Sequence, residues 1–206
     1  MMINLRAAKS SNFLQFDLFD HITEHNITVQ GKVSELIVTK GNYIYTASKK
    51  LNFAYEIVEG AVKLGSYTES GQEYIYDVIG HHCVFGNFEY LNNDQFYEFS
   101  KAMVDSRIRV YDLAFFKELI AQDKKVNEWF IGYLIIRWCN AEKKIKMANE
   151  KGALDKVLYL KEYFQEKVLD CSGQEYDLFD LLTKKDLGDL IGATRQTIAN
   201  TLRKVY

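Results

Sequence analysis

The sequence lacks any run of about 18 consecutive apolar residues, so we expect no membrane-spanning helix. Its first residues contain no signal-peptide core. Its three cysteines, Cys83, Cys139 and Cys171, are odd in number and widely spaced. They indicate reduced thiols and a cytoplasmic location rather than a disulfide framework. The sequence also lacks proline, an absence for which we have no functional account.

The chain has no large excess of charge of either sign. Its net charge is −2 over 206 residues, with 48% hydrophobic and 26% charged residues. This is an ordinary globular composition, long enough for one large or two small domains, and it argues against a protein that is basic all over. The last 24 residues differ, because five basic and two acidic side chains give them a local charge of +3. Such a basic face is sufficient to contact a nucleic-acid backbone, with modest non-specific affinity.

Residues 183–206 have the pattern of two short helices joined by a tight turn. Thr183 and Asp186 form a rough capping box at the start of the first helix. Gly188 is small enough to let the second helix approach closely, and Gly192 stands where the first helix must stop and the chain turn. Thr194 is placed to cap the second helix.

The second helix has one apolar face and one hydrogen-bonding face. Its apolar face carries Ile198, Leu202 and Val205, and its other face presents Arg195, Gln196, Thr197 and Asn200. The combination resembles a DNA-binding helix-turn-helix and favours DNA binding over the alternative, an ordinary helical hairpin. Thr201 is a mild departure, because these motifs usually carry a larger apolar residue there.

A β-rich region extends from Lys32 to about Asp112 and follows a short apolar helix predicted over residues 12–22. Glycines separate the β-rich runs Asn42–Thr46, Phe53–Val58, Ala61–Tyr67, Glu73–Ile79, Phe99–Val104 and Arg107–Leu113. This spacing predicts an antiparallel sandwich or roll.

Helical periodicity begins at Leu113 and continues into a long helix predicted from Lys124 to Asn149. Asn127 begins a seam with alternating steps of four and three residues, which continues through Ile131, Leu134, Trp138, Ala141 and Ile145. The seam favours pairing with a second copy, whereas the alternative is packing within the chain. Phe130, Tyr133 and Ile135 lie off the seam and are expected to cover the roll.

A hinge is predicted at Lys151-Gly152, where a basic residue and a glycine end the long helix. Another amphipathic helix follows from Leu154 to Phe164. The predicted domains are therefore a roll at 1–123, a dimerisation helix at 124–150 and a helix-turn-helix domain at 151–206.

The whole order of elements resembles the Crp/Fnr family of bacterial transcription regulators. The best-matching segments are Tyr55-Glu-Ile-Val-Glu-Gly-Ala-Val-Lys63, Glu69-Ser-Gly-Gln-Glu73, Gly80 to Gly86, and Val110 to Ile120. The resemblance implies an α+β fold with a cyclic-nucleotide-binding-like β-roll, a long dimerisation helix and a C-terminal helix-turn-helix. It also implies a homodimeric regulator that binds palindromic double-stranded DNA, with RNA polymerase as a further candidate partner.

The recognition helix matches the family unevenly. Arg195 matches an arginine that reads a guanine edge, Gln196 suits adenine, and Asn200 replaces a basic residue. Thr194 and Thr197 match phosphate-contacting positions, and Lys184 is a further candidate for DNA binding. Family members usually continue into a β-hairpin, the wing, whereas this sequence ends at Tyr206. A sensory or interaction protein that no longer binds DNA is therefore the alternative.

The effector site departs from the cyclic-nucleotide-binding pattern. Gly86 is followed by Asn87 instead of Glu, and Phe96-Tyr97 replaces the Arg-Ser pair that holds the phosphate. Ala141 and Glu142 stand in place of two hydroxyl residues, and Lys101 reaches the site only in a different loop register. By alignment the pocket is lined by Phe85, Gly86, Asn87, Phe96, Tyr97, Tyr133 and Arg137. We expect no cyclic AMP binding, and the aromatic rings either fill the cavity or stack on a flat, uncharged effector that the sequence does not identify.

Other chemistry has little support in the sequence. His81, His82 and Cys83 are metal-ligand or redox types, but adjacent ligands without a partner cluster favour an ordinary surface turn. The cysteine cluster of iron–sulfur members is absent, and no metal or cofactor is expected. No nucleophile–base pair stands out, and Asp177 with Asp180 is typical of a solvated face, so an enzyme is not favoured.

Overall fold

The computed structural model describes residues 16–47, 52–88, 97–150 and 152–205. Its strands are β1 (Val33–Val38), β2 (Tyr43–Tyr45), β3 (Phe53–Glu59), β4 (Val62–Tyr67), β5 (Glu73–Ile79), β6 (Val84–Phe85), β7 (Phe99–Ala102), β8 (Ser106–Asp112), β9 (Lys167–Leu169) and β10 (Glu175–Asp177). Its helices are α1 (Leu18–Glu24), α2 (Leu113–Gln122), α3 (Lys124–Ala148), α4 (Ala153–Tyr163), the 3-10 helix η2 (Leu178–Leu181), α5 (Lys184–Ile191) and α6 (Arg195–Leu202).

Strands β1 to β8 form a roll of two antiparallel sheets, in the orders β1-β8-β3-β6 and β2-β7-β4-β5. Most side chains between the sheets are apolar, and both sheets contribute to them, for example Ile57 and Ile108 from one and Leu64 from the other. Each fully buried aliphatic side chain of this kind contributes about 1.5–3 kcal/mol. The predicted α+β architecture with an antiparallel roll is confirmed, although β1 and β6 were not predicted.

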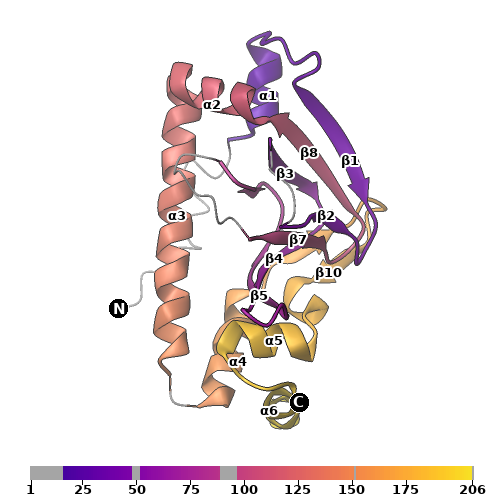
Figure 1. Ribbon diagram of the computed structural model, residues 1–206, viewed down its shortest axis with the longest axis vertical. Helices are drawn as coiled ribbons and strands as arrows, with labels where there is room; N and C mark the ends of the chain where they lie inside the picture. Colours follow the sequence, from indigo (N-terminus) through magenta and orange to yellow (C-terminus); the bar gives the residue numbers. More distant parts are fainter. Residues whose placement is uncertain (1–15, 48–51, 89–96, 151, 206) are drawn as a thin grey trace.

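Helices α1, α2 and the first turns of α3 close one end of the roll (Figure 1). Leu18, Phe116 and Phe130 are buried there in a common apolar cluster. Nε2 of His21 in α1 lies 2.8 Å from a carboxylate oxygen of Asp123, which caps the N-terminus of α3. Within the described residues this helix begins at Leu18, after Phe16 and Asp17, which are not helical, and residues 12–15 of the prediction lie outside the described part of the chain.

Helix α3 runs along one side of the roll for 25 residues (Figure 1). Only Val126, Trp129, Phe130 and Met147 are buried on it. It ends at Ala148 with Asn149 as its cap, so the prediction that Gly152 ends this helix is wrong. Gly152 has extended backbone angles and instead precedes α4 as its N-cap, while Lys151 lies outside the described residues.

The C-terminal region packs against the roll instead of standing apart from it. One apolar cluster joins Ile75 and Phe99 of the roll to Leu160, Leu187 and Ile198 of the C-terminal helices. Polar contacts reinforce this interface. Nζ of Lys63 lies 2.9 Å from Asp186, and the backbone N–H of Ile75 donates to Asp189 at 3.1 Å.

A small hairpin of β9 and β10 precedes η2 and was not predicted from the polar stretch around Asp170. It also contacts the roll, because the N–H of Gly60 donates to the carbonyl of Leu169 at 2.7 Å. Among the described helices, none is both long and apolar enough to cross a membrane.

Candidate DNA-binding surface and roll interior

The turn between α5 and α6 has the local geometry that its sequence requires. The side chain of Thr183 accepts from the N–H of Asp186, whose carboxylate accepts from the N–H of Thr183, and this completes a capping box. Gly192 follows α5 with a φ of +68°, a left-handed conformation that favours glycine. A Cβ on Gly188 would lie 2.5 Å from the carbonyl oxygen of Ala193, so a larger residue would push the turn away from α5.

Helix α6 is capped at its N-terminus and held in place by its buried face. The hydroxyl of Thr194 accepts from the N–H of Thr197 at 3.1 Å. Ile198 is completely buried in the cluster shared with the roll and α4. Thr201 is buried too, and its hydroxyl donates to the carbonyl of Thr197 at 2.8 Å. The polar group at this usually apolar position therefore has a partner.

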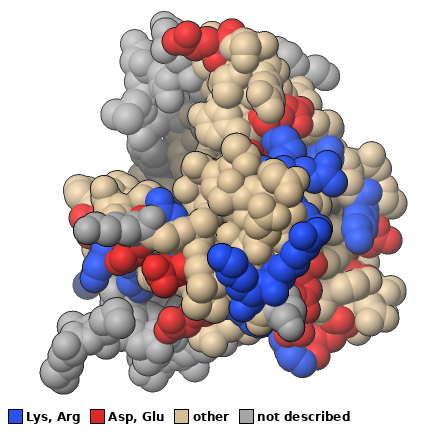
Figure 2. Space-filling model, turned by 90° about the horizontal axis from the view of Figure 1, so that it is seen from below, with Lys and Arg blue, Asp and Glu red and all other residues tan. Residues whose placement is uncertain are grey.

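The opposite face of α6 is open. The side chains of Thr194, Arg195, Gln196, Thr197 and Asn200 are exposed, as is that of Lys184 at the start of α5. The amide of Gln196 donates to Asn200 at 3.2 Å, so these two side chains already lie together. Seen from below, Lys and Arg side chains lie near the middle of the face where α6 and the C-terminal end are found (Figure 2).

Aromatic side chains pack against one another in the roll interior near Gly86. Phe85 is buried and lies 5.4 Å from the ring of Tyr55 and 6.0 Å from that of Tyr45, measured between centroids. Gly86 has a φ of +113° and begins the segment that contains Asn87. Tyr97 is 58% exposed and does not line the interior, which corrects its assignment to the pocket. Phe96 lies outside the described residues.

The cationic groups of α3 near the roll already have an anionic partner. Arg137 lies 3.2 Å from the carboxylate of Asp77 on β5, and Lys144 pairs with the other oxygen of that carboxylate. The hydroxyl of Tyr133 donates to the carbonyl of Val84 and accepts from Arg137 at 3.3 Å. Both cations are therefore already paired with the carboxylate of Asp77.

Glu98 adds a buried carboxyl group to this interior. The hydroxyls of Tyr45 and Tyr76 donate to its two oxygens. Burial raises the pKa of Glu98 to about 7, although the bond from Tyr45 and the charge of Arg137 act in the opposite direction. Lys101 does not neutralise the charge of the Glu98 carboxyl group. It pairs across the sheet with Tyr43 and Lys63, and its ammonium lies 4.6 Å from the Tyr43 ring, on the outer face.

The roll and the whole chain are both similar to known proteins. Residues 35–123 match the family model of the cyclic nucleotide-binding domain. FixK2 from Bradyrhizobium japonicum is 18% identical with a TM-score of 0.65, covering 84% of each chain. A mutant of CooA from Carboxydothermus hydrogenoformans is 17% identical with a TM-score of 0.67, covering 92% of this chain and 84% of that one. TTHB099, a transcriptional regulator of the CRP family from Thermus thermophilus, is 13% identical with a TM-score of 0.65, covering 82% and 83%.

The chain has the same fold as these three proteins. The resemblance inferred from the sequence is thereby confirmed at the level of architecture. No curated protein sequence matches the chain closely enough to count as a relative. The aromatic and acidic groups around Phe85 and Glu98 lie in the part of the chain that is similar to the cyclic nucleotide-binding domain.

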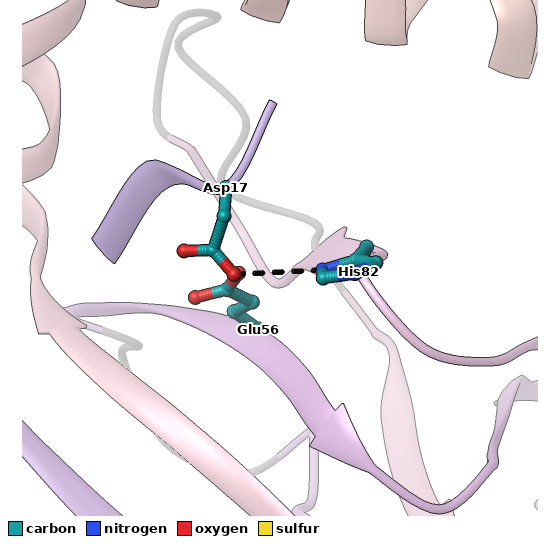
Figure 3. A group of neighbouring side chains, drawn as sticks. All are labelled: Asp17, Glu56 and His82. Carbon is teal, nitrogen blue, oxygen red and sulfur yellow. Dashed lines mark ion pairs between the residues drawn. The ribbon is translucent and has the colours of Figure 1, made fainter. Parts of the chain in front are cut away.

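The His81-His82-Cys83 loop joins β5 to β6, and both of its histidines are exposed. Burial raises the pKa of the Cys83 thiol to about 11, so it is not a reactive thiolate. His82 instead lies beside Asp17, which precedes α1, and Glu56 on β3 (Figure 3). Sequence analysis missed this group because its members are 26 or more positions apart and only the fold brings them together.

Proposed function

We propose that the chain is a homodimeric, sequence-specific DNA-binding transcription regulator. The observation that carries the proposal is the exposed donor face of α6, on a helix that is capped by Thr194 and anchored by Ile198. An α-helix fits the major groove, where an arginine fork recognises guanine and an amide side chain recognises adenine. Arg195 and Gln196 are therefore the proposed base readers, and Thr194, Thr197, Asn200 and Lys184 the supporting contacts.

The dimer is proposed through the exposed side of α3. Ile131, Leu134, Trp138 and Ile145 are 45–69% exposed, and Ala141 between them is exposed as well. Ile135 was expected to cover the roll but is 57% exposed, so it widens the apolar strip. An apolar strip at heptad spacing on a 25-residue helix fits a second copy of the same helix.

The roll is proposed not to bind cyclic AMP. A cyclic phosphate in this interior would meet Asp77 and the carboxyl of Glu98, while Arg137 and Lys144 are already paired. Burying an anion without an available cation is strongly unfavourable. We propose that the roll binds either a planar, uncharged effector or no effector.

We also propose that the protein is cytoplasmic and acts beside RNA polymerase. The proposed domain boundaries are at residues 123 and 150.

Selection of binding sites from random duplexes tests the proposed reader. We expect a palindromic site and a shift that weakens as salt is added. Arg195→Ala should cost about 1–3 kcal/mol on that site and relax one base position, whereas Thr197→Ala should weaken all duplexes alike.

Lys125→Ala is the matched control, because it removes an exposed positive charge near the start of α3, far from α6. It should leave the selected sequence unchanged. An unchanged sequence logo for Arg195→Ala would contradict the assignment of α6 as the reader. Failure to shift any duplex would favour the sensory protein without DNA binding.

A further inference from the structure

Three side chains of metal-ligand type converge between α1 and the roll. Asp17 precedes α1, Glu56 lies on β3, and His82 lies in the loop before β6 (Figure 3). One ligand atom from each can be chosen so that all three lie within 4.8 Å of one another. The residues come from three separate segments, so their convergence is a product of the fold.

We propose that Asp17, Glu56 and His82 form a binding site for one divalent transition-metal ion. This goes beyond the proposed DNA binding and does not depend on it. The site would link the N-terminal helix to the roll at the end where α1 meets α3.

The one distance between two of these ligand atoms is close to what such an ion requires. Oδ2 of Asp17 lies 3.8 Å from Nδ1 of His82. Bonds of about 2.0–2.2 Å in a tetrahedral arrangement place neighbouring ligand atoms about 3.4 Å apart. Three protein ligands leave one position for water or another small ligand.

Hydrogen bonds already fix the two carboxylates. Oδ1 of Asp17 accepts from the N–H groups of Phe19 and Asp20 at 2.8 and 2.9 Å, so its other oxygen faces His82. Oε2 of Glu56 accepts from Arg109 at 3.0 Å and from Tyr111 at 2.6 Å. Groups that orient a ligand in this manner normally support metal sites.

The local charge is compatible with a cation in spite of Arg109. That guanidinium also lies 3.5 Å from Glu35, so its positive charge is shared between two carboxylates. Arg107 also pairs with Glu35 and with Glu59, so together with Asp17 the group contains four carboxylates and two guanidiniums.

The ligand types indicate the class of ion. An imidazole nitrogen with two carboxylates suits zinc, iron(II) or manganese(II) better than magnesium, which prefers oxygen ligands and keeps its waters. An ion here would also affect α3. It would hold the start of α1, and α1 reaches the N-cap of α3 through the His21–Asp123 bond.

The test is calorimetric titration of the full, untagged chain with Zn²⁺, Mn²⁺ and Mg²⁺. We expect one Zn²⁺ or Mn²⁺ per chain with a Kd in the micromolar range or below, and much weaker Mg²⁺ binding. Asp17→Asn and His82→Gln should each weaken Zn²⁺ binding at least tenfold. Asparagine still caps a helix, so Asp17→Asn removes ligand charge without removing the cap.

His81→Gln is the matched control, since it removes the adjacent exposed histidine and should leave affinity unchanged. Thermal unfolding gives a second readout, because an ion that binds the folded chain raises its Tm. That rise should be lost in Asp17→Asn and His82→Gln, while both variants match the parent without metal. The proposal is overturned if Zn²⁺ binding survives both Asp17→Asn and His82→Gln, or if His81→Gln loses as much Zn²⁺ affinity as they do. It is also overturned if neither Zn²⁺ nor Mn²⁺ binds the parent chain at submillimolar concentration.

Discussion

Replacing Glu98 by glutamine should change how the stability of the chain depends on pH. Glu98 is only 8% exposed, and its pKa rises from 4.5 to about 7 on burial. Between these values the folded state binds its proton and the unfolded state does not. The stabilisation from holding this proton is therefore complete below pH 4.5 and is lost as the pH rises to about 7.

The magnitude follows from the distance between the two pKa values. An interval of about 2.5 pH units corresponds to about 3 kcal/mol of unfolding free energy. Glutamine has nearly the same shape, accepts a hydrogen bond from one phenol and does not titrate. The difference in unfolding free energy between the parent and Glu98→Gln should thus shift by up to about 3 kcal/mol, against the parent, from pH 4.5 to pH 7.5.

Urea unfolding at several pH values in this range measures that difference. Other titrating groups cancel because the two chains share them. Glu69→Gln, which alters an exposed glutamate, serves as the control and should give a constant difference from the parent. A constant difference for Glu98→Gln as well would refute the assignment of a proton to this buried carboxyl.

The remaining predictions concern the dimer, the turn, the docked C-terminal region and the effector. The double variant Leu134→Glu, Trp138→Glu should give monomers in sedimentation that keep the β-sheet signal. The control Ile37→Glu, at an exposed apolar position on β1, should remain dimeric. Persistent dimers of the double variant would place the interface elsewhere. Gly188→Ala should cost at least about 2 kcal/mol by denaturant unfolding, because its Cβ would meet backbone at 2.5 Å, and a neutral result would mean that the turn relaxes freely. Lys63→Met should cost about 2 kcal/mol, since it leaves the buried carboxylate of Asp186 without a cation. An unchanged midpoint would show that the 2.9 Å pair contributes nothing. Titration with cyclic AMP or cyclic GMP should give no heat at millimolar ligand, and saturable micromolar binding would contradict the reasoning about the roll.

The sequence correctly predicted those caps, turns and strands that depend only on neighbouring residues. The capping box at Thr183, the left-handed glycine at 192 and the bounds of β5 all agree with the structure, because caps, turns and alternation depend on neighbouring residues. Strand β1 was missed because four of its six residues are exposed, so it lacks a buried alternating face. Strand β6 has only two residues, too short for any pattern.

Long-range contacts could not be predicted in this way. The exposure of Tyr97 and Ile135 depends on which neighbours cover them, and spacing along the chain does not carry that information. The same holds for the pairing of Arg137 with Asp77, 60 residues apart. The candidate metal ligands Asp17 and Glu56 gave no signal, because each resembles an ordinary surface or sheet carboxylate until the fold places it beside His82.

A footprint of the purified chain on its selected duplex tests the central claim most directly. If two copies pair through α3 and each presents α6 to the major groove, two protected patches should appear, related by two-fold symmetry. Their centres should lie about 34 Å apart, or about 10 base pairs, which is one helical turn. A single unsymmetrical patch, or protection without regard to sequence, would contradict the account of this chain as a dimeric reader of DNA.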